Sequence, residues 1–404
     1  MRILLFAAFY PPYIQGGAEL SAQNLAAWLV ARGHEVGVLT TSPHAEDDLE
    51  DVIVDQIRMW RISMPRLYTV FEAMRKSGWR KPIWHAQDHF DPRNATIVTR
   101  VLDSFQPDLV NVHIMQGIGW NGLTAIGKRD LPTVFTLHDL SLACIRMAMF
   151  VAGKECEGLC SLCEISSKVK MAYIHSIRRA GFISPSLANL KKIRELQQID
   201  KYPQAHILNA NQYPTPTADF EKSSTMRFLY VGRLDRAKGI YLLVDALEPL
   251  AGSYDLKLTI VGSGPSESDF RRRCADCEWI EFTGHVSPQE VANRMAASDL
   301  LVVPSIWLEN SPGAIVQALG LSLPVIASNK GGIPELVVDG ENGILVRAGD
   351  EVAWRTTFKQ VLDQPSILKK FRKGAKAKAS NFDQNVIGNQ TIEFFDKIVG
   401  LPAS

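Results

Sequence analysis

Short apolar runs alternate with helical patterns along the chain, and this alternation occurs twice. In the first half, a helical pattern at 21–31 is accompanied by strand-like runs at 3–9, 36–40, 109–112 and 133–137. In the second half, a helical pattern at 240–250 is accompanied by strand-like runs at 227–232, 256–262, 279–284, 300–304 and 324–328. Such alternation is typical of βαβ units, whose strands form a parallel sheet. We therefore predict an α/β protein with two successive domains.

A segment without periodicity predicts where the domains meet. Residues 209–224 are rich in Pro, Thr, Ser and Asn, which favour turns and loops. The length of 404 residues suits two or three domains of about 150 residues each. We predict domains at 1–210 and 211–385, and a final helix within 386–404 that returns to the first domain.

The composition argues against several classes of protein. With 44 basic and 43 acidic residues, the net charge of +1 gives no overall attraction to nucleic acid or acidic lipid. No apolar run approaches the ~18 residues that span a bilayer. The apolar start runs into Pro11 and Pro12 without a clear cleavage site, so we interpret it as a buried strand rather than a signal peptide. We expect a cytoplasmic protein without a nucleic-acid partner, whose six cysteines are thiols or metal ligands.

Glycines and charged residues follow several predicted strands. Gly16 and Gly17 precede a helix, whose first N–H groups are suited to a phosphate. Residues 232–239 follow the first strand of the second domain and carry Arg233 and Lys238, two cations suited to a diphosphate. Glu309 also follows a strand, beside a helix start whose donors suit sugar hydroxyls and phosphate. Taken singly, each segment is equally compatible with a flexible turn or a solvated loop.

Taken in order, these motifs resemble those of the family-four (group 1) retaining glycosyltransferases. The motifs are GGAE at 16–19, GRLDRAKG at 232–239, ENSP at 309–312, LPVIAS at 323–328 and GGIPELVVDGENG at 331–343. The resemblance implies a GT-B fold, in which two Rossmann-like domains with parallel sheets face each other across a cleft. It also implies transfer of a hexose-type sugar from a UDP- or GDP-linked donor to a saccharide or lipid-linked acceptor, without a metal required for catalysis.

The resemblance further implies roles for individual residues. The catalytic set would be His113, Arg233, Lys238 and Glu309. Besides Arg233, Lys238 and Glu309, the donor-binding set would be Gly16, Gly17, Gly262, Val286, Asn310, Ser311, Pro312, Gly313 and Gln317. The family usually has a ribose-binding glutamate where this chain has Gln317. Glutamine keeps an acceptor oxygen but loses the charge, so the ribose contact is the point at which the chain departs from the pattern.

Two histidines come at the ends of predicted strands. His113 matches the second of two family histidines spaced by one residue, which usually faces the donor sugar, whereas Asn111 replaces the first. His138 and Asp139 follow the next strand, where we predict that they contact the acceptor. A purely structural role is the alternative for each histidine.

Four cysteines lie within 20 residues, at Cys144, Cys156, Cys160 and Cys163. Four thiolates in one loop suit a tetrahedral structural zinc ion, which would help to order a loop with little apolar periodicity. The spacing is not a standard zinc pattern, and four reduced thiols are the alternative.

Residues 58–84 combine basic and aromatic side chains. The segment has seven basic residues (Arg58, Arg61, Arg66, Arg75, Lys76, Arg80, Lys81), one acid (Glu72) and five aromatic residues (Trp60, Tyr68, Phe71, Trp79, Trp84). This composition favours peripheral contact with anionic lipid at the inner face of a membrane, or with a lipid-diphosphate acceptor. Contact with single-stranded nucleic acid and a solvated helix pair that covers the first domain are the alternatives.

The resulting prediction is a glycosyltransferase of cell-surface polysaccharide or lipopolysaccharide assembly. Other functions stay open: a GT-B phosphorylase or glucan synthase, and a non-catalytic sugar-nucleotide sensor or assembly partner, which Asn111 and Gln317 would suit. A dehydrogenase is less compatible, because Gly16–Gly17 is not a Gly-x-Gly-x-x-Gly turn.

Overall fold

The fold is described from a computed structural model of the whole chain. The structure describes residues 1–402 except for residues 15, 44–48, 65, 74–78, 152, 210 and 218–223. These residues form two compact units. The first unit comprises residues 1–149, 157–211 and 384–404, and the second comprises residues 150–156 and 212–383.

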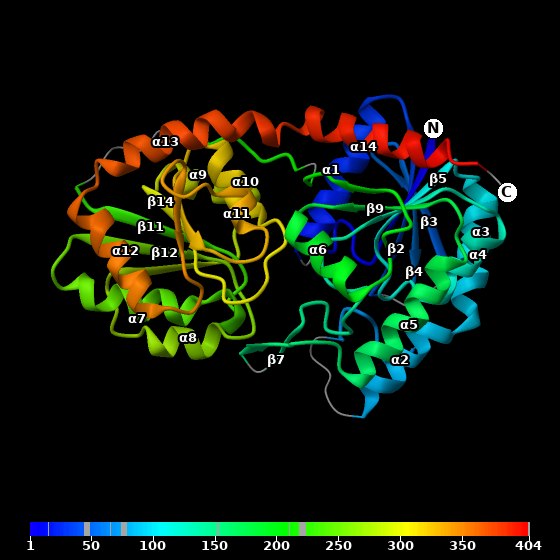
Figure 1. Cartoon of the computed structure of the whole chain (residues 1–404), viewed down its shortest axis with the longest axis horizontal. Coiled ribbons are helices and arrows are strands. Elements are labelled where there is room, and N and C mark those ends of the chain that lie inside the picture. The colour runs from blue at the N-terminus through cyan, green and yellow to red at the C-terminus, as the bar shows by residue number, and fades with distance from the viewer. Residues whose placement is uncertain are drawn as a thin grey trace. The chain divides into compact units, whose positions relative to one another are not determined.

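The first unit contains an eight-stranded sheet (Figure 1). All neighbouring strands are parallel except the edge pair β3 and β4, which is antiparallel. In sheet order the strands are β10 (Gln204–His206), β9 (Ala180–Ser184), β6 (Thr133–Thr136), β5 (Leu109–Ile114), β1 (Arg2–Ala7), β2 (Glu35–Thr41), β4 (Ile57–Ile62) and β3 (Leu49–Val54).

Helices complete this unit. They are α1 (Gly17–Ala31), α2 (Arg80–Phe90), α3 (Pro92–Phe105), α4 (Leu123–Lys128), α5 (Ser161–His175), α6 (Leu187–Leu196) and α14 (Gln384–Val399), with the 3-10 turn η1 (Trp120–Gly122). β1 is almost wholly buried, because parallel strands covered on both faces need apolar side chains throughout. The apolar start of the chain, predicted as a buried strand, is therefore an internal strand of the sheet.

The second unit contains a six-stranded, all-parallel sheet. In sheet order its strands are β13 (Ile280–Gly284), β12 (Leu256–Val261), β11 (Met226–Val231), β14 (Leu300–Val303), β15 (Val325–Ser328) and β16 (Gly343–Val346). The hairpin β7 (Phe150–Val151) and β8 (Lys154–Glu155) also belongs to this unit, although it lies far from it in sequence. Glu155 forms an ion pair with Lys330 at 3.1 Å.

Helices cover both faces of the second sheet (Figure 1). They are α7 (Ile240–Ala251), α8 (Glu267–Arg273), α9 (Pro288–Ala296), α10 (Gly313–Gly320), α11 (Ile333–Leu336), α12 (Glu351–Asp363) and α13 (Ile367–Lys378), with the 3-10 turns η2 (Arg236–Lys238) and η3 (Ala379–Phe382). Buried aromatic side chains, among them Phe228, Trp354 and Phe358, join α12 to the sheet in one apolar core.

The strand orders locate the positions where ligands bind in such folds. β11 lies between β12 and β14, and β1 lies between β2 and β5, so the chain reverses its direction of winding beside each first strand. Open α/β sheets bind ligands outside the carboxyl ends of the strands at this reversal. Lys238 and Glu309 follow β11 and β14. In the first unit, Gly16 lies between β1 and α1, and His113 lies near the end of β5.

Candidate active site

Lys238 and Glu309 form an ion pair in the second unit. Lys238 ends η2, after β11, and Glu309 lies in the loop after the neighbouring strand β14. The Lys238 Nζ atom donates to Glu309 Oε1 at 2.7 Å. Lys238 Nζ also lies 4.9 Å from the ring centroid of Trp307, in a cation–π contact. Two predicted catalytic residues, 71 positions apart, are thus in direct contact.

Glu309 is held ionised by its surroundings. The residue is only 5% exposed, and burial by itself raises the pKa of its carboxyl group. The charge of Lys238 and hydrogen bonds from Lys238, Ser305 and Trp307 outweigh that effect, so the pKa lies below its ordinary value. Ser305 Oγ and Trp307 Nε1 donate to Oε1 at 2.5 and 2.8 Å. Oε2 accepts no hydrogen bond from the described residues, which leaves one carboxylate oxygen for a ligand hydroxyl.

Two glycines allow the backbone to pack closely around this ion pair. Gly239 has a φ of +74°, and a Cβ atom there would overlap the Pro304 carbonyl. Gly331 has a φ of +60°, and a Cβ atom there would overlap the backbone of Glu309. Gly332 N also donates to the Glu309 carbonyl at 2.9 Å. The GGIPE motif therefore supports the loop that carries Glu309, a function that its sequence did not reveal.

The other predicted donor-binding residues of this unit occupy strand ends and loops. Arg233 is exposed and forms an ion pair with Asp235 at 3.1 Å. The backbone of Gly262, directly after β12, packs against the Gly232 carbonyl, and Val286 is half-buried two residues after β13. The residues before α10 (Asn310, Ser311, Pro312) and its first residue, Gly313, are also half-buried.

Gln317 is the one predicted ribose ligand, and it lies inside α10. It is 6% exposed, and its Nε2 atom is buried without a hydrogen-bond partner among the described residues. A buried amide donor without a partner costs roughly 1–3 kcal/mol. A ligand oxygen that accepted from Nε2 would remove this cost.

In the first unit, His113 and His138 are hydrogen-bonded to each other. His113 Nδ1 and His138 Nε2 are 2.7 Å apart, and the rings stack with centroids 5.0 Å apart. Burial lowers the pKa of His138 to about 4 and holds the pKa of His113 well below its ordinary value. Both rings are therefore neutral near pH 7, and one N–H donates to the other ring. The buried His113 Nε2 has no partner among the described residues.

Carboxylates accompany this histidine pair. Asp139 Oδ1 accepts from Ser141 N at 2.7 Å, and burial raises the pKa of Asp139. Glu19 is 5% exposed and accepts from Gly16 N at 2.8 Å. Burial, and more weakly the charge of Asp139, raise the pKa of Glu19. Gly16 and Gly17 thus stand at the start of α1 beside a buried acid. This acid, Glu19, is the last residue of the GGAE motif, but its sequence context predicted no role for it.

Asn111 has a structural role in this unit. Its Nδ2 atom donates to the Val134 carbonyl and to Thr136 Oγ1, both at 3.0 Å, and so joins β5 to β6.

Two family models match the chain in consecutive segments. Residues 15–151 match "Glycosyltransferase Family 4" and residues 225–364 match "Glycosyl transferases group 1". The chain belongs to the group 1 glycosyltransferases. Like other members, it is a nucleotide-sugar-dependent glycosyltransferase, and it has two Rossmann-like domains.

Two named relatives align with nearly the whole chain of this glycosyltransferase. A glycogen synthase of Mycobacterium tuberculosis is 24% identical, over 98% of this chain and 94% of its own length. A phosphatidyl-myo-inositol mannosyltransferase of Mycobacterium leprae is 23% identical, over 95% and 94% of the two chains.

Solved structures share the fold of this glycosyltransferase. Sucrose-phosphate synthase from Thermosynechococcus elongatus superposes with a TM-score of 0.75 at 19% identity, over 99% of this chain and 100% of the other. Anabaena Alr3699/HepE, solved in complex with UDP and glucose, superposes with a TM-score of 0.72 at 20% identity, over 98% and 99% of the chains.

The cysteines predicted as zinc ligands are only partly brought together. Cys144 Sγ and Cys163 Sγ are 3.8 Å apart, and Cys160 is the N-cap residue of the helix that carries Cys163. Cys156 belongs to the second unit. Over the described part of the chain, no three His, Cys, Asp or Glu side chains are placed to hold a metal ion. Zinc binding by the four cysteines stays a prediction.

The segment 58–84 does not form one basic and aromatic surface. Arg58 and Arg61 pair with acidic residues of β3, and the Arg66–Asp88 ion pair is buried, with 2% exposure of each side chain. Trp60, Tyr68 and Trp84 are buried, because they pack inside the unit. The exposed side chains include Leu67, Trp79, Arg80, Lys81, Pro82 and Ile83, while Arg75 and Lys76 lie outside the described residues. No helix within the described ranges is long and apolar enough to span a membrane.

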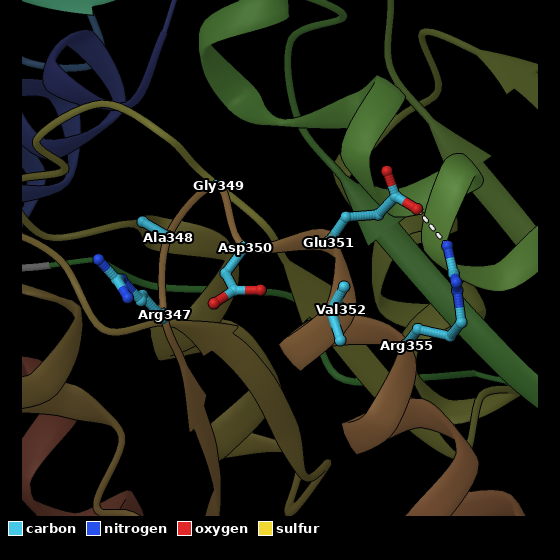
Figure 2. A pocket seen from close by; sticks show the side chains of 7 residues that line it. All are labelled: Arg347, Ala348, Gly349, Asp350, Glu351, Val352 and Arg355. Carbon is cyan, nitrogen blue, oxygen red and sulfur yellow. Dashed lines mark hydrogen bonds and ion pairs between the residues drawn. The ribbon is translucent and has the colours of Figure 1, made fainter.

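A surface hollow of about 480 Å³ lies elsewhere in the second unit (Figure 2). It is lined by Arg347, Ala348, Gly349, Asp350, Glu351, Val352 and Arg355. Glu351 and Arg355 pair with each other, and Asp350 caps α12 by accepting from Ala353 N. No predicted donor-binding residue lines this hollow, and three of its charged side chains, Asp350, Glu351 and Arg355, already have partners in α12.

Proposed function

We propose that this glycosyltransferase moves a hexosyl group from a UDP- or GDP-linked donor to an acceptor hydroxyl with retention of configuration. The Lys238–Glu309 pair is the observation that carries the proposal. It combines a cation beside the ends of β11 and β14 with a carboxylate whose Oε2 atom is open to a sugar hydroxyl. A donor with a diphosphate and a sugar needs both of these groups.

The proposed reaction is a front-face displacement. The bond between the sugar anomeric carbon and the diphosphate oxygen breaks, and a bond to the acceptor oxygen forms on the same face. The acceptor proton passes to the departing diphosphate oxygen. Lys238 and Arg233 stabilise the negative charge that develops on the diphosphate, and Glu309 orients the donor sugar. The anomeric configuration of the product, measured by NMR, tests retention directly.

The donor class can be tested by calorimetry with UDP, GDP and ADP. The proposal expects micromolar binding of one nucleotide, which Arg233→Ala weakens. The HepE structures solved with UDP and with UDP-glucose support a nucleotide of this kind by analogy of fold. If no nucleotide binds, the donor proposal is wrong. Binding without turnover over a broad acceptor panel would instead favour the sugar-nucleotide sensor.

We further propose that the acceptor is a saccharide or lipid-linked hydroxyl bound near His113, His138 and Asp139. A role in cell-surface polysaccharide or lipopolysaccharide assembly is supported by the names of several relatives. These include a putative teichuronic acid biosynthesis glycosyltransferase of Bacillus subtilis, 27% identical over 62% of this chain, and the structural neighbour WaaG, described as involved in lipopolysaccharide biosynthesis. Activity with lipid-linked and free saccharide acceptors tests this proposal.

Peripheral contact with the inner face of a membrane is the remaining part of the proposal. Trp79 is 69% exposed and stands next to the exposed Arg80 and Lys81, so this end of α2 combines an aromatic anchor with positive charge. We expect the protein to cosediment with anionic vesicles but not with neutral ones. The Trp79→Ala variant should not cosediment with either. Equal recovery in the supernatant with both kinds of vesicle would contradict it.

A further inference from the structure

Three cysteines of the first unit form a thiol cluster that the proposed transfer reaction does not use. Cys160 is exposed and stands at the N-cap of α5, and Cys163 lies one turn further along the helix, 9% exposed. Cys144, 4% exposed, comes from the segment after β6, and its Sγ atom lies 3.8 Å from Cys163 Sγ. The cluster therefore has one sulfur open to solvent and two buried sulfurs behind it.

The charges around the cluster favour a reactive thiolate at its exposed end. Cys160 is exposed and is the N-cap residue of α5, a position at which the helix dipole favours the thiolate form of a cysteine. Cys163, one turn further along the helix, is buried, and burial disfavours its thiolate. An exposed thiol at a helix start, followed after two residues by a buried thiol, is the arrangement of thiol–disulfide exchange motifs.

A buried lysine accompanies the two inner sulfurs. Lys170 is 4% exposed, and its Nζ atom donates to the Ser141 carbonyl at 2.6 Å. Burial lowers the pKa of Lys170 to about 8, while Cys144 and Cys163 lie close enough to raise it.

We propose that Cys160, Cys163 and Cys144 form a thiol–disulfide exchange site that reacts with low-molecular-weight disulfides. The Cys160 thiolate attacks one sulfur of the reagent, the reagent S–S bond breaks, and one thiol leaves with a proton. Cys163 then loses its proton and attacks Cys160 Sγ, which releases the second reagent thiol and forms the Cys160–Cys163 disulfide. Cys144 attacks Cys163 Sγ in turn, which regenerates the Cys160 thiol and leaves a buried Cys144–Cys163 disulfide. Overall, two protein thiols are oxidised and one reagent disulfide is reduced to two thiols.

The two buried sulfur atoms already lie close together, so the last step needs little movement. Closing Cys144 Sγ to Cys163 Sγ from 3.8 Å to a bond of ~2.05 Å requires side-chain adjustment rather than a new fold. Cys144 N donates to the Leu140 carbonyl at 2.8 Å, in the segment that begins with His138 and Asp139. The disulfide would therefore tie this segment to α5.

The same thiols were predicted as zinc ligands, and the geometry favours exchange instead. A disulfide needs one pair of sulfurs, which the structure supplies, whereas a zinc site needs three or four ligands around one point. No such group occurs among the residues described.

The test uses the reduced full-length chain in glutathione redox buffers of increasing oxidised fraction. Free thiols are alkylated, and linked peptides are mapped by mass spectrometry. The expected result is a Cys144–Cys163 or Cys160–Cys163 disulfide, while the buried Cys274 and Cys277 stay alkylated as an internal control. Cys160→Ser should slow the reaction at least tenfold, and Cys163→Ser should accumulate one glutathionyl group on Cys160.

Ser161→Ala is the matched variant, since it alters an exposed side chain of the same turn without removing a thiol. It should react at the wild-type rate. Three results would each overturn the proposal: all three thiols remain free in strongly oxidising buffer, Cys160→Ser reacts as fast as the wild type, or the purified chain carries about one zinc ion that blocks the thiols.

Discussion

At the residue scale, the Lys238–Glu309 ion pair would hold the two parts of the proposed donor, the diphosphate and the sugar. We predict that Lys238→Ala lowers kcat at least about 100-fold, because the leaving diphosphate loses a charge that is worth roughly 3 kcal/mol in the transition state. The fold should survive, since Ser305 and Trp307 still donate to Glu309. Steady-state kinetics and thermal unfolding measure the two effects. Lys257→Ala removes an exposed ion pair to Glu281 in the same unit and should leave kcat unchanged, so equal turnover of both variants would refute the assignment.

The histidine pair predicts a pH dependence of stability. The unfolded chain binds protons at histidine pKa values near ~6.5, whereas the folded pair resists protonation down to about pH 4 at His138. The neutral histidine pair therefore contributes fully to stability above about pH 6.5, and this contribution is lost as the pH falls toward 4. The loss is on the order of 1–3 kcal/mol in the free energy of unfolding. His138→Gln should flatten this part of a urea-denaturation profile. His285→Gln changes an exposed histidine and serves as the control, and identical slopes for both variants would count against the buried pair.

At the scale of elements, α14 depends on a close approach to α1. A Cβ atom at Gly388 would overlap the Trp28 ring, and Trp28 Nε1 donates to Asn385 at 3.0 Å. We predict that Gly388→Ala lowers the free energy of unfolding by about 1–3 kcal/mol, because the helices must move apart. Gly252→Ala, where nothing lies within 4 Å and φ is −77°, should change it by less than about 0.5 kcal/mol. Urea denaturation compares them, and equal stability would mean that α14 does not pack as described.

At the scale of the whole molecule, residues 212–383 contain a complete sheet, an apolar core and the Lys238–Glu309 pair. The hairpin at 150–156 adds the partly exposed Glu155–Lys330 pair, and such pairs contribute at most about 1 kcal/mol. We predict that the fragment 212–383 unfolds cooperatively and binds the same nucleoside diphosphate as the full chain, within about tenfold in affinity. Arg233→Ala in the fragment should weaken this binding. An unfolded fragment, or one that fails to bind while the full chain binds, would contradict the prediction.

Local signals predicted much of this molecule. The alternation of apolar runs and helical patterns indicated two α/β domains, because strand and helix periodicities are set by neighbouring residues. The turns after β11 and β14 identified Arg233, Lys238 and Glu309 as site candidates, because ligands bind at the carboxyl ends of parallel strands. The same reasoning missed the edge strands β3 and β4, which pair antiparallel, and the parallel strands β9, β10 and β16.

Tertiary structure decided which side chains meet and which are buried. The sequence could not reveal that Ser305, Trp307 and Lys238 share one oxygen of Glu309, that His113 bonds to His138, or that Arg66 and Trp84 are internal rather than part of a basic and aromatic surface. Nor could it indicate that the hairpin at 150–156 joins the second unit. Partner choice and burial depend on packing between residues far apart in the chain, whereas turn chemistry and periodicity are encoded within a few positions.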